Sequence, residues 1–230
     1  MRLVLFDIDG TLVNTLGAGK AALESAMRSV YGETGPIDSF DFHGRTDPAI
    51  VRGLLRAAGR QDAEIEAGFE ATWEAYLGVL DRELVGRDGR VHPYPGVTKL
   101  LDAIEDDARF APGLVTGNME GGARRKLEAC GLARRFAFGA YGSDSERRED
   151  LPPIARDRAE RQYGRPFGLR TAIVVGDTPE DIRCARANGT RVLAVSTGRH
   201  TVEELRDHDP DVVLEDLSNT SRVMQVLADE

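Results

Sequence analysis

Two aspartates separated by one residue follow a short apolar run near the start of the chain, in the segment Asp7-Ile8-Asp9-Gly10-Thr11-Leu12. Leu3 to Phe6 has the composition of a buried parallel strand. Both carboxylates are therefore expected just beyond its carboxyl end, where open α/β sheets bind ligands, and both should point the same way. Like charges held that close need a cation or a shared proton. The pattern predicts a carboxylate nucleophile beside a second carboxyl group, with a divalent metal between them.

This segment has two other interpretations. Asp and Gly often mark a turn at the end of a strand, where glycine allows the chain to bend sharply. Asp-x-Asp-Gly also resembles part of a calcium-binding loop. The EF-hand pattern fails, because Thr11 and Leu12 stand where that loop needs a ligand and its invariant glycine. We therefore favour the catalytic interpretation.

A second polar group follows a strand-like run in Gly113-Leu114-Val115-Thr116-Gly117-Asn118. The Thr116 hydroxyl and nearby backbone N–H groups are suited to hold phosphate oxygens. The same residues also suit the cap of a helix that begins near Met119. The sequence leaves both interpretations open.

A third strand-to-helix junction carries acids at residues 174–181. Thr178 as N-cap, Pro179 as first helical residue and Asp181 as third form a capping box in which Asp replaces Glu. Capping does not explain Asp177, which precedes the cap at the strand end. Asp177 is therefore the better candidate for a metal ligand, and Asp181 is expected to support the site from behind it.

A cationic partner for phosphate is expected between these two motifs. Arg147 and Arg148 precede a predicted helix there, and arginine suits bidentate phosphate binding. The alternative is a solvated pair of charges in a polar turn.

Strand-like runs alternate with helical patterns along most of the chain, which predicts a parallel sheet wrapped by helices. We predict that the second strand begins after Pro112, because proline does not fit inside a central parallel strand. The strand-like runs are Leu3–Phe6, Gly113–Thr116, Phe136–Gly139, Thr171–Val175, Arg191–Val195 and Asp211–Leu214.

Residues 14–87 interrupt this alternation with three apolar stripes at helical spacing and no strand signal. They predict a helical bundle inserted after the first strand, with residues 1–13 and 88–230 forming the α/β core. Glycines and prolines at 86–96 indicate the return hinge. A bundle hinged beside the carboxylate pair is well placed to act as a lid.

Composition limits the partners of this chain. It has 230 residues, of which 41% are hydrophobic and 30% charged, with a net charge of −9. This charge argues against nucleic acid or an anionic membrane as partner, although local cations can still bind a small anion. Cys130 and Cys184 match no metal or redox spacing and are interpreted as reduced packing thiols. No signal peptide or membrane span is recognised, so a cytoplasmic monomer or homodimer is expected.

Taken in order, DxDGT, a strand followed by TGN, a basic residue and GDTxxD resemble the haloacid dehalogenase (HAD) superfamily. The resemblance covers nearly the whole chain and is strongest to phosphoglycolate-phosphatase-like hydrolases. It implies a doubly wound, Rossmann-like parallel-sheet core with an inserted all-helical cap domain. It also implies Mg²⁺ dependence and hydrolysis of a small phosphomonoester.

The resemblance also implies roles for single residues. Asp7 would be the nucleophile and Asp9 the general acid and base; Thr116 would bind phosphate, and Asn118 would support the loop or contact the ligand. Mg²⁺ would be held by Asp7, Asp177 and the backbone carbonyl of Asp9. The third motif commonly has lysine, whereas only arginine is available here, and the spacing before Leu151 favours Arg148 over Arg147.

The predicted helical segment contains a candidate for substrate selection. Asp47 and Pro48 are expected as N-cap and first residue of a helix. Arg45, in the preceding turn, would reach down to a substrate carboxylate or second anionic group, unless it forms a surface ion pair. Lys20 is a weaker candidate of the same kind.

Three functions are compatible with these residues. The favoured one is a Mg²⁺-dependent phosphatase acting on a small phosphorylated substrate through an aspartyl-phosphate. A phosphomutase of the β-phosphoglucomutase kind would use the same aspartate pair. A non-catalytic binding protein on the same fold is the third, and the presence of Asp7, Asp9 and Asp177 argues against it.

Overall fold

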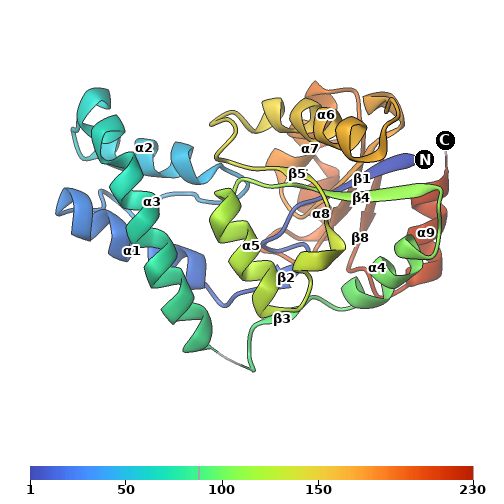
Figure 1. Cartoon of the computed structure of the whole chain (residues 1–230), viewed down its shortest axis with the longest axis horizontal. Coiled ribbons are helices and arrows are strands. Elements are labelled where there is room, and N and C mark those ends of the chain that lie inside the picture. The colour runs from blue at the N-terminus through green and yellow to red at the C-terminus, as the bar shows by residue number, and fades with distance from the viewer. Residues whose placement is uncertain (88, 230) are drawn as a thin grey trace.

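The computed structural model describes residues 1–87 and 89–229, and a six-stranded parallel sheet is its central feature (Figure 1). The strand order is β5-β4-β1-β6-β7-β8. The predicted parallel α/β sheet is thereby confirmed. Its strands are β1 (Arg2–Phe6), β4 (Phe110–Val115), β5 (Gly139–Ala140), β6 (Ile173–Gly176), β7 (Arg191–Val195) and β8 (Val212–Leu214).

Helices cover both faces of the sheet, so its strands are apolar on both sides. In β1, Val4 and Phe6 pack into one apolar cluster, and Leu3 and Leu5 pack into the other. The first cluster is completed by α4 (Val97–Glu105), α5 (Glu120–Ala129) and α9 (Thr220–Ala228). The second is completed by α6 (Leu151–Tyr163), α7 (Pro179–Ala187) and α8 (Val202–Arg206).

The strand order reverses beside β1. The chain first adds β4 and β5 on one side of β1, and then returns to add β6, β7 and β8 on the other. In open α/β sheets, the crevice at such a switch point, beyond the carboxyl ends of the strands, is where ligands bind. Here that crevice lies beyond β1 and β6, the strands that Asp7 and Asp177 directly follow.

The three predicted helical stripes form α1 (Ala18–Tyr31), α2 (Asp47–Ala57) and α3 (Asp62–Val85), which share an apolar cluster of their own. In Figure 1 these helices stand together at the left of the sheet. A two-stranded ladder of β2 (Val13–Asn14) and β3 (His92–Pro93) joins the chain where it leaves the sheet and where it returns. The predicted hinge at 86–96 contains residue 88, which, like residue 230, lies outside the described residues.

Short 3₁₀ turns shift two predicted strand starts. Phe136 follows the turn Ala133–Arg135, and β5 begins only at Gly139. Thr171 ends the turn Leu169–Thr171, and β6 begins at Ile173. None of the helices in the described part of the chain is long and apolar enough to span a lipid bilayer.

Pro112 lies inside β4, so the prediction that this strand begins after it is wrong. The Leu114 N–H donates to the Phe138 carbonyl, on the β5 side of the strand. Along a strand, the backbone N–H groups of alternate residues point to the same neighbouring strand. The Pro112 nitrogen, two residues before Leu114, therefore also points to the β5 side. Because β5 has not yet begun at this level, the proline removes no ladder hydrogen bond.

This geometry predicts that substitutions at two neighbouring positions change the free energy of unfolding by very different amounts. Pro112→Ala should change the free energy of unfolding by less than about 1 kcal/mol, because the new N–H gains no strand partner. Ala111→Pro should cost about 3 kcal/mol or more, because the Ala111 nitrogen faces β1. Urea unfolding of both variants tests this, and similar stabilities would contradict the assigned strand orientation.

Candidate active site

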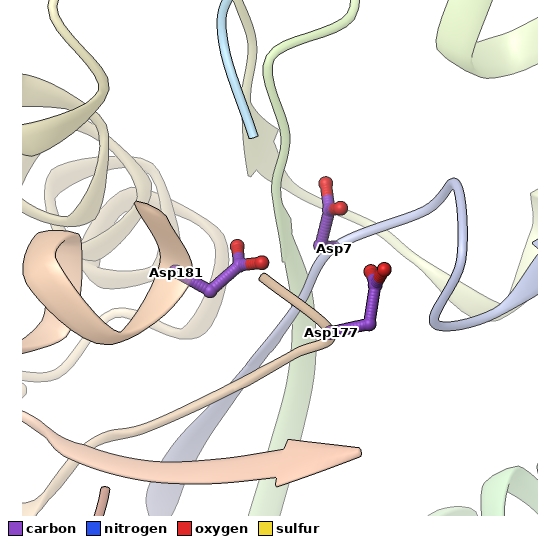
Figure 2. Close-up of side chains that lie close together, drawn as sticks. All are labelled: Asp7, Asp177 and Asp181. Atoms are coloured by element: carbon purple, nitrogen blue, oxygen red, sulfur yellow. The ribbon is translucent and has the colours of Figure 1, made fainter. Parts of the chain in front are cut away.

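Three buried aspartates meet at the carboxyl ends of β1 and β6 (Figure 2). Asp7 directly follows β1, Asp177 directly follows β6, and Asp181 lies in the first turn of α7. One carboxylate oxygen from each lies within 4.8 Å of the other two. The side chains converge although they come from distant parts of the sequence, as predicted for Asp7 and Asp177.

Burial makes this cluster electrostatically costly. It raises the pKa of Asp7 to about 6; the Arg148 guanidinium opposes that shift, while the charges of Asp181 and Asp9 add to it. Burial also raises the pKa of Asp177 well above its ordinary value, again with contributions from neighbouring carboxylates. The cluster therefore favours an added proton or a cation.

Arg148 is the cation that lies within this cluster. Its Nη2 donates to Asp181 Oδ1 at 2.5 Å and lies 3.0 Å from Asp7 Oδ1. Its Nε is the one buried side-chain nitrogen or oxygen without a hydrogen-bond partner in the described parts of the chain. The Arg147 side chain is instead 75% exposed and pairs with Asp150. Of the two predicted arginines, the fold thus brings Arg148 to the aspartates.

Asp177 is held against the turn that follows β1. Thr11 Oγ1 donates to Asp177 Oδ1 at 2.9 Å. Gly10 has a φ of +84°, and a Cβ atom there would overlap the Asp177 carboxylate, as would one on Gly198. Glycine is therefore required by space as well as by backbone conformation. Asp177 Oδ2 has no hydrogen-bond partner among residues 1–87 and 89–229, so it is available to another ligand.

The predicted capping box at the start of α7 is confirmed. Thr178 Oγ1 accepts from the Asp181 N–H at 3.3 Å, and Asp181 Oδ2 accepts from the Thr178 N–H at 3.0 Å. Since Asp181 Oδ1 accepts from Arg148, both oxygens of this carboxylate have protein partners. Asp181 thus orients Arg148 and has less capacity than Asp177 to take a further ligand.

Asn118 contacts the second aspartate of the first motif. Its Nδ2 donates to Asp9 Oδ2 and to Thr116 Oγ1, each at 2.8 Å. The N-cap of α5 is Met119, whose side chain makes no capping hydrogen bond. Helix capping, the alternative role of this motif, is therefore wrong for Asn118. Thr116 is fully buried beside Asn118.

Lys126 is a site residue that the sequence reasoning missed. Its Nζ donates to Asp9 Oδ2 at 2.6 Å and to Asn118 Oδ1 at 2.5 Å. Burial alone would lower the pKa of Lys126, but the charges of Asp9, Tyr76 and Asp47 outweigh this and raise it. The available signal was a lysine on the same buried face of α5 as Ala123 and Leu127.

A cavity of about 680 Å³ opens between these groups and the three helices of the 14–87 segment. Thr116 and Asp181 are not among the residues that line it, so they lie behind its wall. From the sheet side it is lined by Asp7, Asp9, Asn118, Lys126, Arg148 and Asp177. From the helical side it is lined by residues that include Lys20, Phe40, Phe42, Arg45, Asp47 and Tyr76.

Both cationic candidates of the helical segment face this cavity. The Arg45 guanidinium carbon lies 5.5 Å from the centre of the Phe40 ring, and Lys20 Nζ lies 5.2 Å from that of Phe42. Across the described residues, neither cation has an acidic partner within ion-pair distance, so the surface ion pair considered for Arg45 is not formed.

The start of α2 differs from the prediction by one residue. Thr46, not Asp47, is the N-cap, because the Thr46 hydroxyl accepts from the Ala49 N–H. Asp47 is the first helical residue, and its carboxylate instead accepts from the Met119 N–H at 2.8 Å. A local capping pattern could not show that this carboxylate has a partner after β4.

Comparisons with known proteins agree with this architecture. A phosphoglycolate phosphatase of Agrobacterium fabrum is 28% identical over 219 residues, covering 94% of this chain and 89% of the relative. One of Pseudomonas fluorescens is 26% identical over 221 residues, covering 94% and 77%. The crystal structure of a hydrolase from Pseudomonas syringae superposes with a TM-score of 0.74 at 18% identity, covering 100% of both chains.

The family model described as haloacid dehalogenase-like hydrolase matches residues 4–195. That match spans all three aspartates of the cluster as well as Asp9, Asn118 and Arg148. The chain therefore belongs to the haloacid dehalogenase-like hydrolases.

Proposed function

We propose that this protein is a Mg²⁺-dependent phosphatase that hydrolyses a small phosphomonoester through an aspartyl-phosphate. The observation that carries the proposal is the group of buried carboxylates around Arg148, with Asp7 and Asp9 both facing one cavity. The phosphoglycolate phosphatases that align with 94% of the chain support the same chemistry.

Asp7 and Asp9 would divide the chemistry between them. A carboxylate oxygen of Asp7 attacks phosphorus, and the bond from phosphorus to the ester oxygen breaks. Asp9 gives its proton to that departing oxygen, and then takes a proton from the water that attacks the aspartyl-phosphate. Phosphate leaves, and both aspartates regain their starting states.

Asn118 and Arg148 are the groups best suited to hold the phosphate. Both line the cavity, and Arg148 carries a buried Nε without a partner in the described residues. A guanidinium binds phosphate oxygens by charge-assisted hydrogen bonds. We assign Thr116 to the same loop, where its hydroxyl accepts from Asn118 Nδ2.

The acidic cluster fits Mg²⁺, which prefers carboxylate and carbonyl oxygens. Asp7, Asp177 and the backbone carbonyl of Asp9 would hold the ion, with Asp181 supporting them through Arg148. Asp177 Oδ2 has no hydrogen-bond partner in the described residues, and the pKa values of Asp7 and Asp177 are raised; both features favour a cation at this position. When bound, the ion would neutralise charge on the phosphate.

Residues 14–87 would act as a cap over a core formed by residues 1–13 and 88–230. The Asp47 N–H donates to the Gly117 carbonyl at 2.7 Å, and Thr46 Oγ1 donates to the Glu146 carbonyl at 2.8 Å. Arg52 also pairs with the Glu146 carboxylate at 2.7 Å. These contacts hold residues 14–87 against the core beside the cavity, and a cap that closes over a site excludes water from the reaction.

The cap would select the substrate. Arg45 and Lys20 face the cavity without acidic partners in the described chain, so either one can meet a second anionic group of the substrate. A carboxylate such as that of 2-phosphoglycolate has the required charge. This supports a small anionic phosphomonoester as the substrate.

Asp7→Asn should lower kcat by at least about 1,000-fold, because an amide is a poor nucleophile. Phosphate release from p-nitrophenyl phosphate and 2-phosphoglycolate with Mg²⁺ measures the effect. Release to water also distinguishes a phosphatase from a phosphomutase. Asp106→Asn, at an exposed position that does not line the cavity, is the matched control and should keep full activity. If the Asp7 variant turns over substrate nearly as fast as the control, Asp7 is not the nucleophile.

Removal of the metal should abolish activity, and Mg²⁺ should restore it. With EDTA-treated protein, Asp177→Asn should raise the Mg²⁺ concentration for half-maximal activity at least about tenfold, because one charged ligand is lost. Activity is measured across a Mg²⁺ titration. Full activity in EDTA, or an unchanged titration midpoint in the variant, would rule out the proposed metal site.

Asp47 predicts a pH dependence of stability. Burial raises its pKa from 3.8 to about 6, against the opposing effects of Lys126 and the Met119 N–H. Because the folded state favours the neutral acid, the Asp47 carboxyl group contributes to stability at low pH, and this contribution is lost as pH rises through 6. Asp47→Asn keeps an acceptor for Met119 and stays neutral.

The difference in unfolding free energy between Asp47→Asn and the unaltered protein should therefore grow in favour of the variant between about pH 4 and pH 7. Urea unfolding at intervals across that range gives the difference. A difference that does not change with pH would show that the pKa of Asp47 is not raised in the folded protein.

A further inference from the structure

Lys126 occupies an enclosed position between the sheet and the helical segment. Its side chain is 5% exposed, whereas the Asp9 side chain that it contacts is 41% exposed. The two hydrogen bonds of its ammonium, to Asp9 Oδ2 and Asn118 Oδ1, join the turn after β1 to the turn after β4. The buried ammonium of Lys126 thus connects two loops that are far apart in the sequence and adjacent in the folded chain.

Glycines make the space for this lysine. A Cβ atom on Gly19 of α1 would lie 3.0 Å from Lys126 Nζ, and one on Gly122 of α5 would lie 2.9 Å from the Tyr76 ring of α3. The ammonium is therefore enclosed by α1, α3 and α5 as well as by its two partners. A flexible lysine enclosed in this way has little freedom to move.

The consequence falls on Asp9. Its Oδ2 accepts from both Lys126 Nζ and Asn118 Nδ2, at 2.6 and 2.8 Å. Two donors on one oxygen fix the rotation of the carboxyl group. Its Oδ1 has no hydrogen-bond partner in the described chain, and Asp9 lines the cavity. Asp9 is thereby presented with one oxygen anchored and the other available.

We propose that Lys126 is a positioning residue, which holds Asp9 so that the free carboxyl oxygen meets the leaving oxygen of the substrate. This inference rests on the proposed phosphatase function. Lys126 would act through Asp9, so in the first step, phosphate transfer to Asp7, its effect should be confined to substrates whose departure needs a proton. In the second step, attack of water on the aspartyl-phosphate, Asp9 acts as base for every substrate, so the test uses a rate constant that reports the first step alone. Phosphate binding and nucleophilic attack, on the Asp7 side, should be largely unaffected.

The test compares two esters of similar size in the full-length protein with Mg²⁺. Benzyl phosphate loses an alkoxide, which needs a proton, and p-nitrophenyl phosphate loses a stable phenolate, which does not. Lys126→Met should lower kcat/KM for benzyl phosphate by about 100-fold or more, the usual size of a general-acid contribution. Its kcat/KM for p-nitrophenyl phosphate should change by less than about fivefold, because kcat/KM does not include the attack of water on the aspartyl-phosphate.

Three further variants make this result specific. Arg124→Met removes the same charge from an exposed position of the same helix and should leave both rates unchanged. Asp9→Asn should show the same dependence on the leaving group, and adding Lys126→Met to it should cost little more. Gly19→Ala keeps the lysine but presses on its Nζ, so it should reproduce the effect in weaker form.

Other outcomes would overturn the proposal. An equal loss of kcat/KM on both esters, with weaker inhibition by inorganic phosphate, would make Lys126 a phosphate ligand. Unchanged kinetics would leave it no role. If Lys126→Met does not fold, as judged by thermal unfolding, Gly19→Ala decides the question by the same comparison.

Crystal structures of the unaltered protein and Lys126→Met separate this inference from the proposed function. In the variant, the Asp9 carboxyl group should leave the position in which Oδ2 meets Asn118. An unmoved Asp9 would refute the positioning role even if the protein is a phosphatase. If the unaltered protein hydrolyses neither ester, the proposed function fails, and the position of Asp9 still tests the role of Lys126.

Discussion

The accumulation of negative charge at one edge of the sheet constrains the rest of the site. Asp7, Asp177 and Asp181 are almost fully buried within a few ångströms of one another, and the guanidinium that lies among them is that of Arg148. Carboxylates removed from water are stable only when paired, protonated or bound to a metal. Each neighbouring feature, from the capping box of α7 to the orientation of Arg148, can be understood as a response to that cost.

Close packing determines which backbone can surround these charges. Gly10 and Gly198 lie so near the Asp177 carboxylate that a methyl group at either position would overlap it. Gly117 lies where the core meets the helical segment. Because it has no side chain, the backbone of Arg45 can approach it closely. The aspartates are therefore held by backbone that admits little movement, as a preorganised site requires.

The cavity combines two kinds of surface. The sheet contributes acids and cations fixed by buried hydrogen bonds, whereas the helical segment contributes Arg45 and Lys20 next to aromatic rings. Asp47 connects the two sides, because its backbone and side chain both bond to the loop after β4. The groups on the sheet side are fixed, whereas Arg45 and Lys20 have no acidic partner in the described chain. This arrangement suits an enzyme whose reaction stays the same while residues of the helical segment select the substrate.

The sequence by itself determined the sheet and the meeting of Asp7 with Asp177, because the carboxyl ends of parallel strands lie at one edge whatever connects them. It also determined the capping box at Thr178, which is local. Only the tertiary structure decided that Pro112 fits inside β4, that Asp47 bonds to Met119 and that Lys126 reaches Asp9. Those outcomes depend on which neighbour a strand or helix face meets. Such contacts are set by packing over long distances in the chain, which residue spacing does not encode.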